Sequence, residues 1–340
     1  MIGMVTETGN SIIHAAVLLL KGEIVAIPTE TVYGLAANAL NEDAVSAVYI
    51  AKERPYHNPL IVHLHSIKEI EKYVTDVPPA AHTLLKAFAP GPLTVLLPKK
   101  DIVPDIVTAG LPHVAIRIPA HPIAQALLKA VNLPLAAPSA NRFSGISPTS
   151  VQHVQKHLDG IIPYILDGGM CDDGIESTVV GFENNTVVIY RQGAITEEQI
   201  KTALRDGVRV VHKTKTENNI AAAAPGMLHH HYSPDTPLLL TDNIHHCIAQ
   251  YENEGKKIGT IRFDNIAKGI PLSKQIVLSA KGNMREAARN FYASLHYLDE
   301  MGLDVIICEY LPDYGLGKAI NDRLKRAAAK HTAQVVQVMA

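Results

Sequence analysis

Short apolar segments alternate with segments of helical periodicity along most of this chain. The apolar segments are bounded by turn residues and rich in β-branched side chains, which predicts strands. The expected strands are residues 24–28, 59–65, 93–98, 114–119 and 162–166. The expected helices are residues 11–21, 43–54, 67–73, 79–88, 122–131, 149–158 and 196–204. This alternation predicts an α/β or α+β domain.

Local signals add detail to this pattern. Two β-branched runs flank Asn184-Asn185, so residues 177–191 are predicted to form a hairpin. Thr196 and Gln199 have the spacing of a capping box at the start of a helix. Ser147 fits the N-cap position ahead of the helix at 149–158.

The composition changes near residue 208, where a second region begins. Residues 208–236 contain polar runs and turn pairs and are expected to form a linker. The strands expected beyond it are 238–240, 257–263 and 305–309, and the helices are 245–251, 283–301 and 320–330. This alternation favours a small parallel sheet. A length of 340 residues agrees with two domains.

Composition excludes several classes of protein. The net charge is −2, which argues against a general polyanion binder. The three cysteines lie far apart without a Cys-x-x-Cys motif, so neither a zinc ribbon nor a disulfide framework is predicted. The apolar stretch at 12–20 is too short to span a bilayer and lacks the basic flank of a secretory signal. We therefore expect a soluble intracellular protein.

Several polar clusters interrupt the apolar pattern. Residues 28–35, PTETVYGL, follow a strand directly, where a ligand loop or an ordinary turn would lie. Lys52 and Arg54 end a helix, where they suit either a phosphate clamp or the helix dipole. His63 and His65 share one face of a strand, and could bind a ligand or be structural.

One cation lies inside an apolar strand. Arg117, within AIRIP, is costly to bury unless it is paired. It therefore either meets an acid in the core or faces a site that binds an anion.

Two further clusters offer hydroxyl groups. Residues 136–149 hold several hydroxyl side chains, an amide and a glycine after an apolar strand, which suits phosphate oxygens and ribose. Ser177 and Arg191 lie at opposite ends of the predicted hairpin, and either face one cavity or are structural.

Taken together, these clusters resemble the YrdC-like threonylcarbamoyl-AMP synthases. The matching strings are PTETVYGL, the Lys-x-Arg of KERPYHNPL, AIRIP, the Ser-x-Asn of APSANRFSG, and ESTVV followed by Arg191. Residues 225–234 and the tail resemble the linker and the Rossmann-like domain of the longer, two-domain members. The resemblance implies a YrdC-like twisted, open mixed sheet with flanking helices around a large concave site. It divides the chain into a catalytic domain at 1–207, a linker at 208–236 that folds back over the site, and a Rossmann-like domain at 237–340.

The resemblance also implies an activity: L-threonine, bicarbonate and ATP give threonylcarbamoyl-AMP, pyrophosphate and water, for threonylcarbamoyladenosine in tRNA. The threonine side matches Thr31, His63, Arg117, Ala137 and Ser177. The ATP side matches Lys52, Arg54, Asn58, His113, Ser139, Asn141, Ser147, Arg191, His231 and Tyr232. Lys52, Arg54 and Arg191 would act in catalysis by neutralising charge. Mg²⁺ would arrive on the ATP phosphates, without protein ligands.

The implied setting is cytoplasmic, with the product passed to a separate tRNA-modifying transferase and no stable binding of tRNA. Two alternatives stay open: a non-enzymatic RNA-binding protein of the same fold, and a related enzyme that acts on a different amine. Residues 1–211 hold 16 Lys and Arg against 20 Asp and Glu, a net charge of −4. The remainder holds 15 against 13, a net charge of +2. Neither region has the basic excess of a general RNA binder.

Overall fold

The structure, a computed structural model, describes residues 5–204, 207–213 and 232–330. These residues form two compact units. The first unit holds the described residues up to 143, then 148–172, 176–204 and 207–213. The second unit holds 144–147, 173–175 and the described residues from 232 onward. Two short segments from the N-terminal part of the sequence therefore belong to the C-terminal unit.

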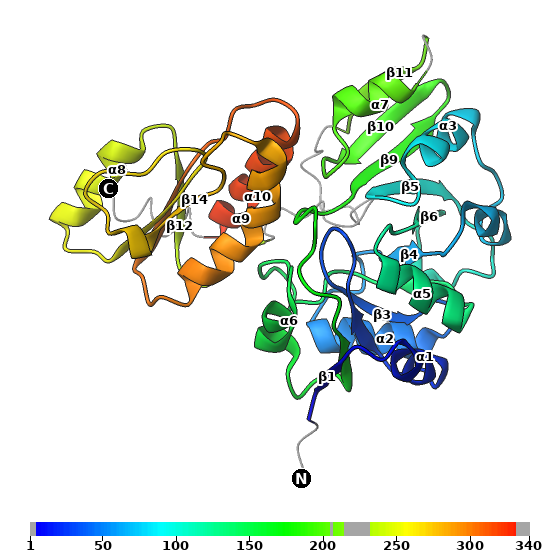
Figure 1. Ribbon diagram of the computed structural model, residues 1–340. Coiled ribbons are helices and arrows are strands. Elements are labelled where there is room, and N and C mark those ends of the chain that lie inside the picture. Colours follow the sequence, from blue (N-terminus) through cyan, green and yellow to red (C-terminus); the bar gives the residue numbers. More distant parts are fainter. Residues whose placement is uncertain (1–4, 205–206, 214–231, 331–340) are drawn as a thin grey trace. The chain divides into compact units, whose positions relative to one another are not determined.

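The first unit is built on a mixed sheet of eleven strands (Figure 1). Their spatial order is β1-β8-β2-β3-β7-β4-β6-β5-β9-β10-β11. Their bounds are β1 Glu7–Gly9, β2 Val25–Ile27, β3 Gly34–Asn38, β4 Ile61–His63, β5 Leu93–Pro98, β6 His113–Arg117, β7 Leu135–Ala136, β8 Tyr164–Leu166, β9 Thr178–Glu183, β10 Thr186–Arg191 and β11 Arg209–His212. Parallel and antiparallel pairs both occur, so the mixed α/β fold is confirmed.

Helices cover the two faces of this sheet unequally. Their bounds are α1 Ile12–Leu20, α2 Glu42–Lys52, α3 Pro79–Phe88, α4 Asp105–Thr108, α5 Pro122–Val131, α6 Val151–Leu158 and α7 Glu197–Ala203, with a 3₁₀ helix at Ile67–Lys72. On one face, α2, α3, α6 and α7 pack on the sheet in one large core. On the other face, α1 and α5 cover only β8, β2, β3 and β7. The rest of that face, over β4, β6, β5 and β9, carries only a small apolar cluster.

Most predicted elements of the first unit are confirmed. The strand at 93–98 and the helix at 122–131 match β5 and α5, and β9 and β10 form the predicted hairpin. The capping box of Thr196 and Gln199 is present. The helix at 67–73 is instead 3₁₀, and Ser150, not Ser147, caps α6. The first residues of the expected linker form β11, which pairs with β10.

The second unit has a four-stranded sheet in the order β12-β15-β13-β14. The strands are β12 Leu238–Thr241, β13 Ile258–Arg262, β14 Gln275–Val277 and β15 Val305–Glu309. The helices are α8 Ile244–Asn253, α9 Met284–Asp299 and α10 Leu316–Ala329, with a 3₁₀ helix at Leu272–Lys274. All strand pairs are parallel, which confirms the small parallel sheet. Among the described residues, no helix is long and apolar enough to cross a membrane.

Candidate active site

Strand register gathers polar side chains on the sheet face that α1 and α5 leave uncovered. His63 of β4 lies opposite Arg117 of β6, and Thr94 of β5 lies opposite Arg117 on its other side. Because side chains alternate along a strand, these three share a face with the apolar residues Ile61, Leu96 and Ala115. His63, Arg117 and Thr94, called the Arg117 row below, therefore lie side by side, next to these apolar residues.

Arg117 is held at the centre of this row. Its Nη1 donates a hydrogen bond to Thr31 Oγ1 at 2.8 Å, and its Nη2 lies 2.7 Å from Glu30 Oε1. Burial raises the pKa of Glu30, but the Arg117 charge together with hydrogen bonds from Arg117 and from the backbone outweighs it, so the net pKa is lowered and the carboxylate is charged. The expectation of an acidic partner is confirmed. Among the described residues, Arg117 Nε has no hydrogen-bond acceptor, which leaves it available to an anionic ligand.

Ser177 links the Arg117 row to Arg191 through hydrogen bonds. Arg191 Nη2 donates to Ser177 Oγ at 3.1 Å and to the Ser177 carbonyl oxygen at 2.9 Å. The Ser177 and Thr94 hydroxyl oxygens lie 2.7 Å apart. Ser177 and Arg191, predicted at opposite ends of the hairpin, are therefore in direct contact. Sequence reasoning missed Thr94, whose only signal is a hydroxyl residue within the apolar strand LTVLLP.

His63 is a neutral side chain rather than a metal ligand paired with His65. Its Nδ1 lies 3.2 Å from the Ile61 carbonyl oxygen, so a proton on Nδ1 would donate there. Burial, followed by the Arg117 charge, lowers the pKa of His63 to about 3. His65 Nδ1 instead lies 2.7 Å from the Glu69 carboxylate. The two histidines therefore have separate partners.

Lys52 lies next to the Ser-x-Asn loop. It is the last residue of α2, and its Nζ donates to the carbonyl oxygens of Ser139 and Asn141. The loop is fixed in turn by hydrogen bonds that join the chain at Tyr33 and Leu35 to Ala140 and Pro138. Burial, followed by the Arg54 charge, lowers the pKa of Lys52 well below its usual range. An anionic ligand would favour the protonated form.

Arg54 and Asn58 lie at the start of β4. Arg54 Nε donates to the Asn58 carbonyl oxygen at 3.1 Å, and Nη2 donates to the Pro59 carbonyl oxygen at 2.8 Å. The Asn58 side chain is fully buried, and neither of its amide atoms has a hydrogen-bond partner among the described residues. A buried amide without partners is costly, so this position is suited to a polar ligand.

Glycine permits the close approach of these two loops. A Cβ atom at Gly34 would lie 3.2 Å from Ala137 Cβ, which is tighter than ordinary contact. Ala137, expected on the threonine side, is therefore packed against the PTETVYGL segment. Its backbone N–H donates to the Ile61 carbonyl oxygen at 2.9 Å, which sets the loop beside β4.

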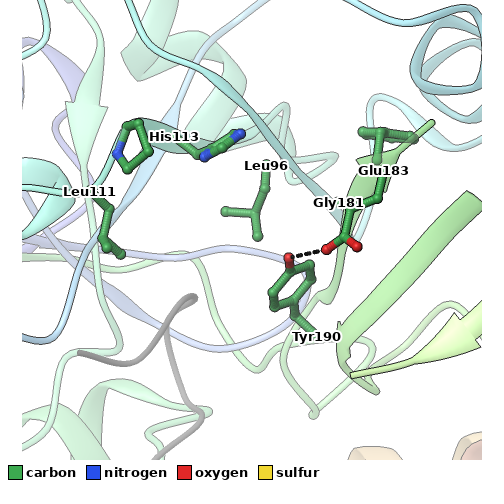
Figure 2. Close-up of a pocket in the computed structure, with 8 residues that line it drawn as sticks. Leu96, Leu111, His113, Gly181, Glu183 and Tyr190 are labelled. Carbon is green, nitrogen blue, oxygen red and sulfur yellow. Dashed lines mark hydrogen bonds between the residues drawn. The ribbon is translucent and has the colours of Figure 1, made fainter. Parts of the chain in front are cut away.

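His113 begins β6, four residues before Arg117. At about 3.3 Å per strand residue, the two lie about 13 Å apart along the strand. His113 lines a pocket of about 140 Å³ together with Leu96, Leu111, Pro112, Gly181, Phe182, Glu183 and Tyr190 (Figure 2). The pocket lies on the same strands as the Arg117 row, at the opposite end.

Three residues predicted to contact ATP do not lie in the described part of the first unit. Ser147 and Tyr232 belong to the second unit. There, His296 Nε2 lies 3.2 Å from the Ser147 carbonyl oxygen, and the Arg323 guanidinium lies 5.1 Å from the centre of the buried Tyr232 ring. His231 and most of the expected linker lie outside the described residues.

No group of three or more His, Cys, Asp or Glu side chains is placed to hold a metal within the part of the chain that the structure describes. The ATP-side groups of the first unit are instead cations, hydroxyls and amides. Such groups suit a metal ion carried by a ligand's own phosphates better than one bound directly by the protein.

Comparison with known proteins identifies the family. Residues 17–193 match the Sua5, YciO and YrdC family, described as "Telomere recombination", and residues 195–329 match the C-terminal domain of threonylcarbamoyl-AMP synthase. The chain belongs to the threonylcarbamoyl-AMP synthase family. It has the two-domain form of that family, and it is an enzyme of the nucleotidyl-transferring type.

Its relatives cover nearly the whole chain. Threonylcarbamoyl-AMP synthase of Bacillus subtilis is 42% identical over 322 residues, which span 93% of this chain and 92% of the relative. The synthase of Pyrococcus abyssi is 38% identical over 94% of this chain and 95% of its own. The crystal structure of P. abyssi Sua5 complexed with L-threonine has a TM-score of 0.86 and 37% identity, covering 96% of this chain and 97% of that chain.

Proposed function

We propose that this enzyme makes threonylcarbamoyl-AMP from L-threonine, bicarbonate and ATP for the modification of tRNA. One observation carries the proposal: His63, Arg117 and Thr94 lie side by side at one end of β4, β6 and β5, and the buried cation Arg54 is hydrogen-bonded to the residues just before β4. The relatives named threonylcarbamoyl-AMP synthase and the L-threonine complex of P. abyssi Sua5 support the same reading.

The Arg117 row is suited to an amino acid. Arg117 would bind the threonine carboxylate through its remaining donors, while Thr31 and Glu30 hold the guanidinium in place. The hydroxyls of Thr94 and Ser177 suit a short side chain that bears a hydroxyl, and Ala137 would contact the methyl group of that side chain.

The reaction then needs no protein nucleophile. The threonine amine would add to bicarbonate with loss of water to form a carbamate. A carbamate oxygen would attack the α-phosphorus of ATP, and pyrophosphate would leave with the electrons of the broken P–O bond. The enzyme has to hold both substrates in line and neutralise negative charge.

Lys52, Arg54 and Arg191 would neutralise that charge. Lys52 donates to the Ser139 carbonyl oxygen, Arg54 to that of Pro59 and Arg191 to that of Ser177, and cations of this kind bind phosphates. Asn58, Ser139 and Asn141 would contact the nucleotide beside them. Mg²⁺ would be held by the ATP phosphates and would lower the charge on the leaving pyrophosphate.

The wider setting follows from the product, which a separate tRNA-modifying transferase would consume. We propose a cytoplasmic enzyme that does not bind tRNA stably. Ser147, His231 and Tyr232 remain proposed ATP contacts, and the linker at 208–236 is proposed to cover the site and protect the labile carbamate from water.

The test is pyrophosphate release from ATP and Mg²⁺, with L-threonine and bicarbonate each omitted in turn. We expect release only when both are present, and slower release with L-serine. Release without L-threonine would indicate another acceptor amine or plain ATP hydrolysis. No release under any combination would reject the synthase reaction and direct attention to salt-dependent RNA binding.

A further inference from the structure

One face of helix α9 packs against segments from distant parts of the chain. The centres of the Tyr232 and Tyr292 rings lie 5.8 Å apart, and His296 Nε2 lies 3.2 Å from the Ser147 carbonyl oxygen. Because Tyr292 and His296 are four positions apart in α9, their side chains share one face of the helix. Both side chains are almost fully buried. This face of α9 therefore contacts Ser147 and Tyr232, both of which are proposed ATP contacts.

His296 is a polar side chain in a place where an apolar one would cost less. A buried imidazole is unfavourable unless it makes hydrogen bonds. Since a carbonyl oxygen only accepts, the hydrogen bond to Ser147 requires a proton on Nε2 of His296. The next carbonyl oxygen, that of Pro148, accepts the Tyr33 N–H at 2.8 Å. Two successive carbonyl oxygens are thus held, which fixes the direction of the backbone at Ser147.

The start of this segment is strained and is also held by the second unit. Ser144 has a φ of +66°, a left-handed conformation that is unfavourable for residues with a Cβ atom. Its carbonyl oxygen accepts the Ser233 N–H at 2.9 Å, and the Ser233 hydroxyl donates to the Ala327 carbonyl oxygen of α10 at 3.2 Å. Strained conformations persist only where their surroundings hold them. The path of residues 144–147 therefore depends on contacts with α9, α10 and Ser233.

The strained segment continues a loop that begins at Ser139. The Lys52 side chain donates to the Ser139 and Asn141 carbonyl oxygens, and the Lys52 carbonyl oxygen accepts the Phe143 N–H at 2.8 Å. We call residues 139–147 the nucleotide loop. Its first half is held by Lys52 of the first unit, and its second half is held by residues of the second unit.

We propose that His296 is a positioning residue for nucleotide binding: its hydrogen bond fixes the backbone, and so the side-chain direction, of Ser147. His296 has this role only if ATP is the ligand of the nucleotide loop, so the inference rests on the proposed function. His296 touches no substrate itself and acts through Ser147. The second unit thereby contributes to the affinity for ATP.

The first test measures binding of ATP with Mg²⁺, and of L-threonine, to the full-length protein by calorimetry. His296→Leu keeps an apolar side chain in the same space but removes the donor, and it should weaken ATP binding about tenfold. Binding of L-threonine, whose proposed contacts lie in the first unit, should stay within about twofold. His296→Gln is the matched control, because its amide nitrogen can donate where Nε2 does, and it should restore most of the ATP affinity.

Two outcomes of this test would overturn the proposal. One is an unchanged ATP affinity in His296→Leu. The other is an equal loss of affinity in His296→Leu and His296→Gln, which would indicate packing rather than a hydrogen bond. A wild-type protein that binds no ATP would refute the proposed function, and the second test would then show whether His296 orders the loop.

The second test needs no ligand. Hydrogen exchange of the backbone amides is followed by mass spectrometry in wild type and in both variants. In His296→Leu, exchange within the nucleotide loop should become at least about fivefold faster, while β12 to β15 keep wild-type rates. His296→Gln should match wild type throughout. Unchanged exchange in the loop would overturn the proposal, and so would equal acceleration across the second unit, which would show a general loss of stability.

Discussion

The two proposed ends of the site, one for L-threonine and one for the nucleotide, hold their cations in different ways. At the threonine end, Arg117 is paired with the buried carboxylate of Glu30. At the nucleotide end, Lys52 and Arg54 donate to backbone carbonyl oxygens, which bear no net charge. A cation held by neutral oxygens keeps its full charge, whereas a paired cation contributes little net field. Lys52, which donates to neutral oxygens, suits a polyphosphate, and Arg117, which is paired with a carboxylate, suits an amino acid that carries both charges.

This contrast also concerns stability. Removing one member of a buried ion pair leaves an uncompensated charge, which typically costs about 3–5 kcal/mol. Removing a cation that donates to carbonyl oxygens leaves these oxygens without a donor. This typically lowers the free energy of unfolding by about 1–3 kcal/mol. Variants at the two ends should therefore differ both in the substrate affected and in the loss of stability.

The largest effect is expected for Arg117→Met. It should lower kcat/KM for L-threonine at least a hundredfold and destabilise the fold by about 3–5 kcal/mol, because Glu30 is left buried and charged. Adding Glu30→Gln should restore much of the stability without restoring activity. Denaturant unfolding and pyrophosphate release measure the two effects. If the double variant stays as unstable as Arg117→Met, the ion pair is not the cause.

At the nucleotide end, Arg54→Ala should lower kcat/KM for ATP by about a hundredfold, because a charged hydrogen bond to phosphate is lost. L-threonine binding, measured by calorimetry, should change less than threefold. Arg54→Lys is the matched control that keeps the charge but loses the fork geometry, and it should fall in between. A larger loss of threonine binding than of ATP binding would remove the distinction between the two ends.

Because His63 is buried, we expect the free energy of unfolding to depend on pH. Its pKa is about 3 when folded against about 6.5 when unfolded, so the unfolded chain binds more protons between these values. Stability should therefore fall as pH decreases below about 6.5, with His63 accounting for about 2 kcal/mol at pH 5. Unfolding free energies of wild type and His63→Gln at pH 7 and pH 5 isolate this part. The same pH dependence in both proteins would show that His63 is not buried as a neutral group.

The smallest effect is expected for Thr94→Val, which removes one hydroxyl at constant shape. Loss of the hydrogen bond to Ser177 should cost about 1 kcal/mol, or about fivefold in kcat/KM for L-threonine. The KM for ATP should be unchanged unless Ser177 also sets the position of Arg191. Thr94→Ser keeps the hydroxyl and should restore wild-type values. Kinetics with each substrate varied in turn separate these outcomes.

Sequence alone predicted much of the fold and the strongest polar signals. An arginine inside an apolar strand indicated either a buried acid or an anion-binding site, and Glu30 is such an acid. The strand at Gly34–Asn38 was missed because its small residues have weak strand propensity, and its pairing with β2 and β7 decides its conformation. Thr94 was missed because its meaning depends on strand register, which joins it to Arg117 and Ser177.

The exact division of the chain into two units could not be predicted from the sequence. Residues 144–147 and 173–175 lie within the N-terminal sequence, yet they belong to the second unit. Part of this membership comes from the hydrogen bond of the Ser233 N–H to the Ser144 carbonyl oxygen at 2.9 Å. Such contacts join residues far apart in the chain, so local composition carries no sign of them.

The parallel pairing of β5 with β9 has a consequence for biosynthesis. It joins Leu93 to Thr178, and the Thr94–Ser177 hydroxyl pair spans 83 residues. At about 5–20 residues per second, a ribosome needs about 4–17 s to make that stretch. During this time β5 has no β9 to pair with and presents an open edge, on which another chain could form a strand. The active site is thus among the last parts of the first unit to form on the ribosome.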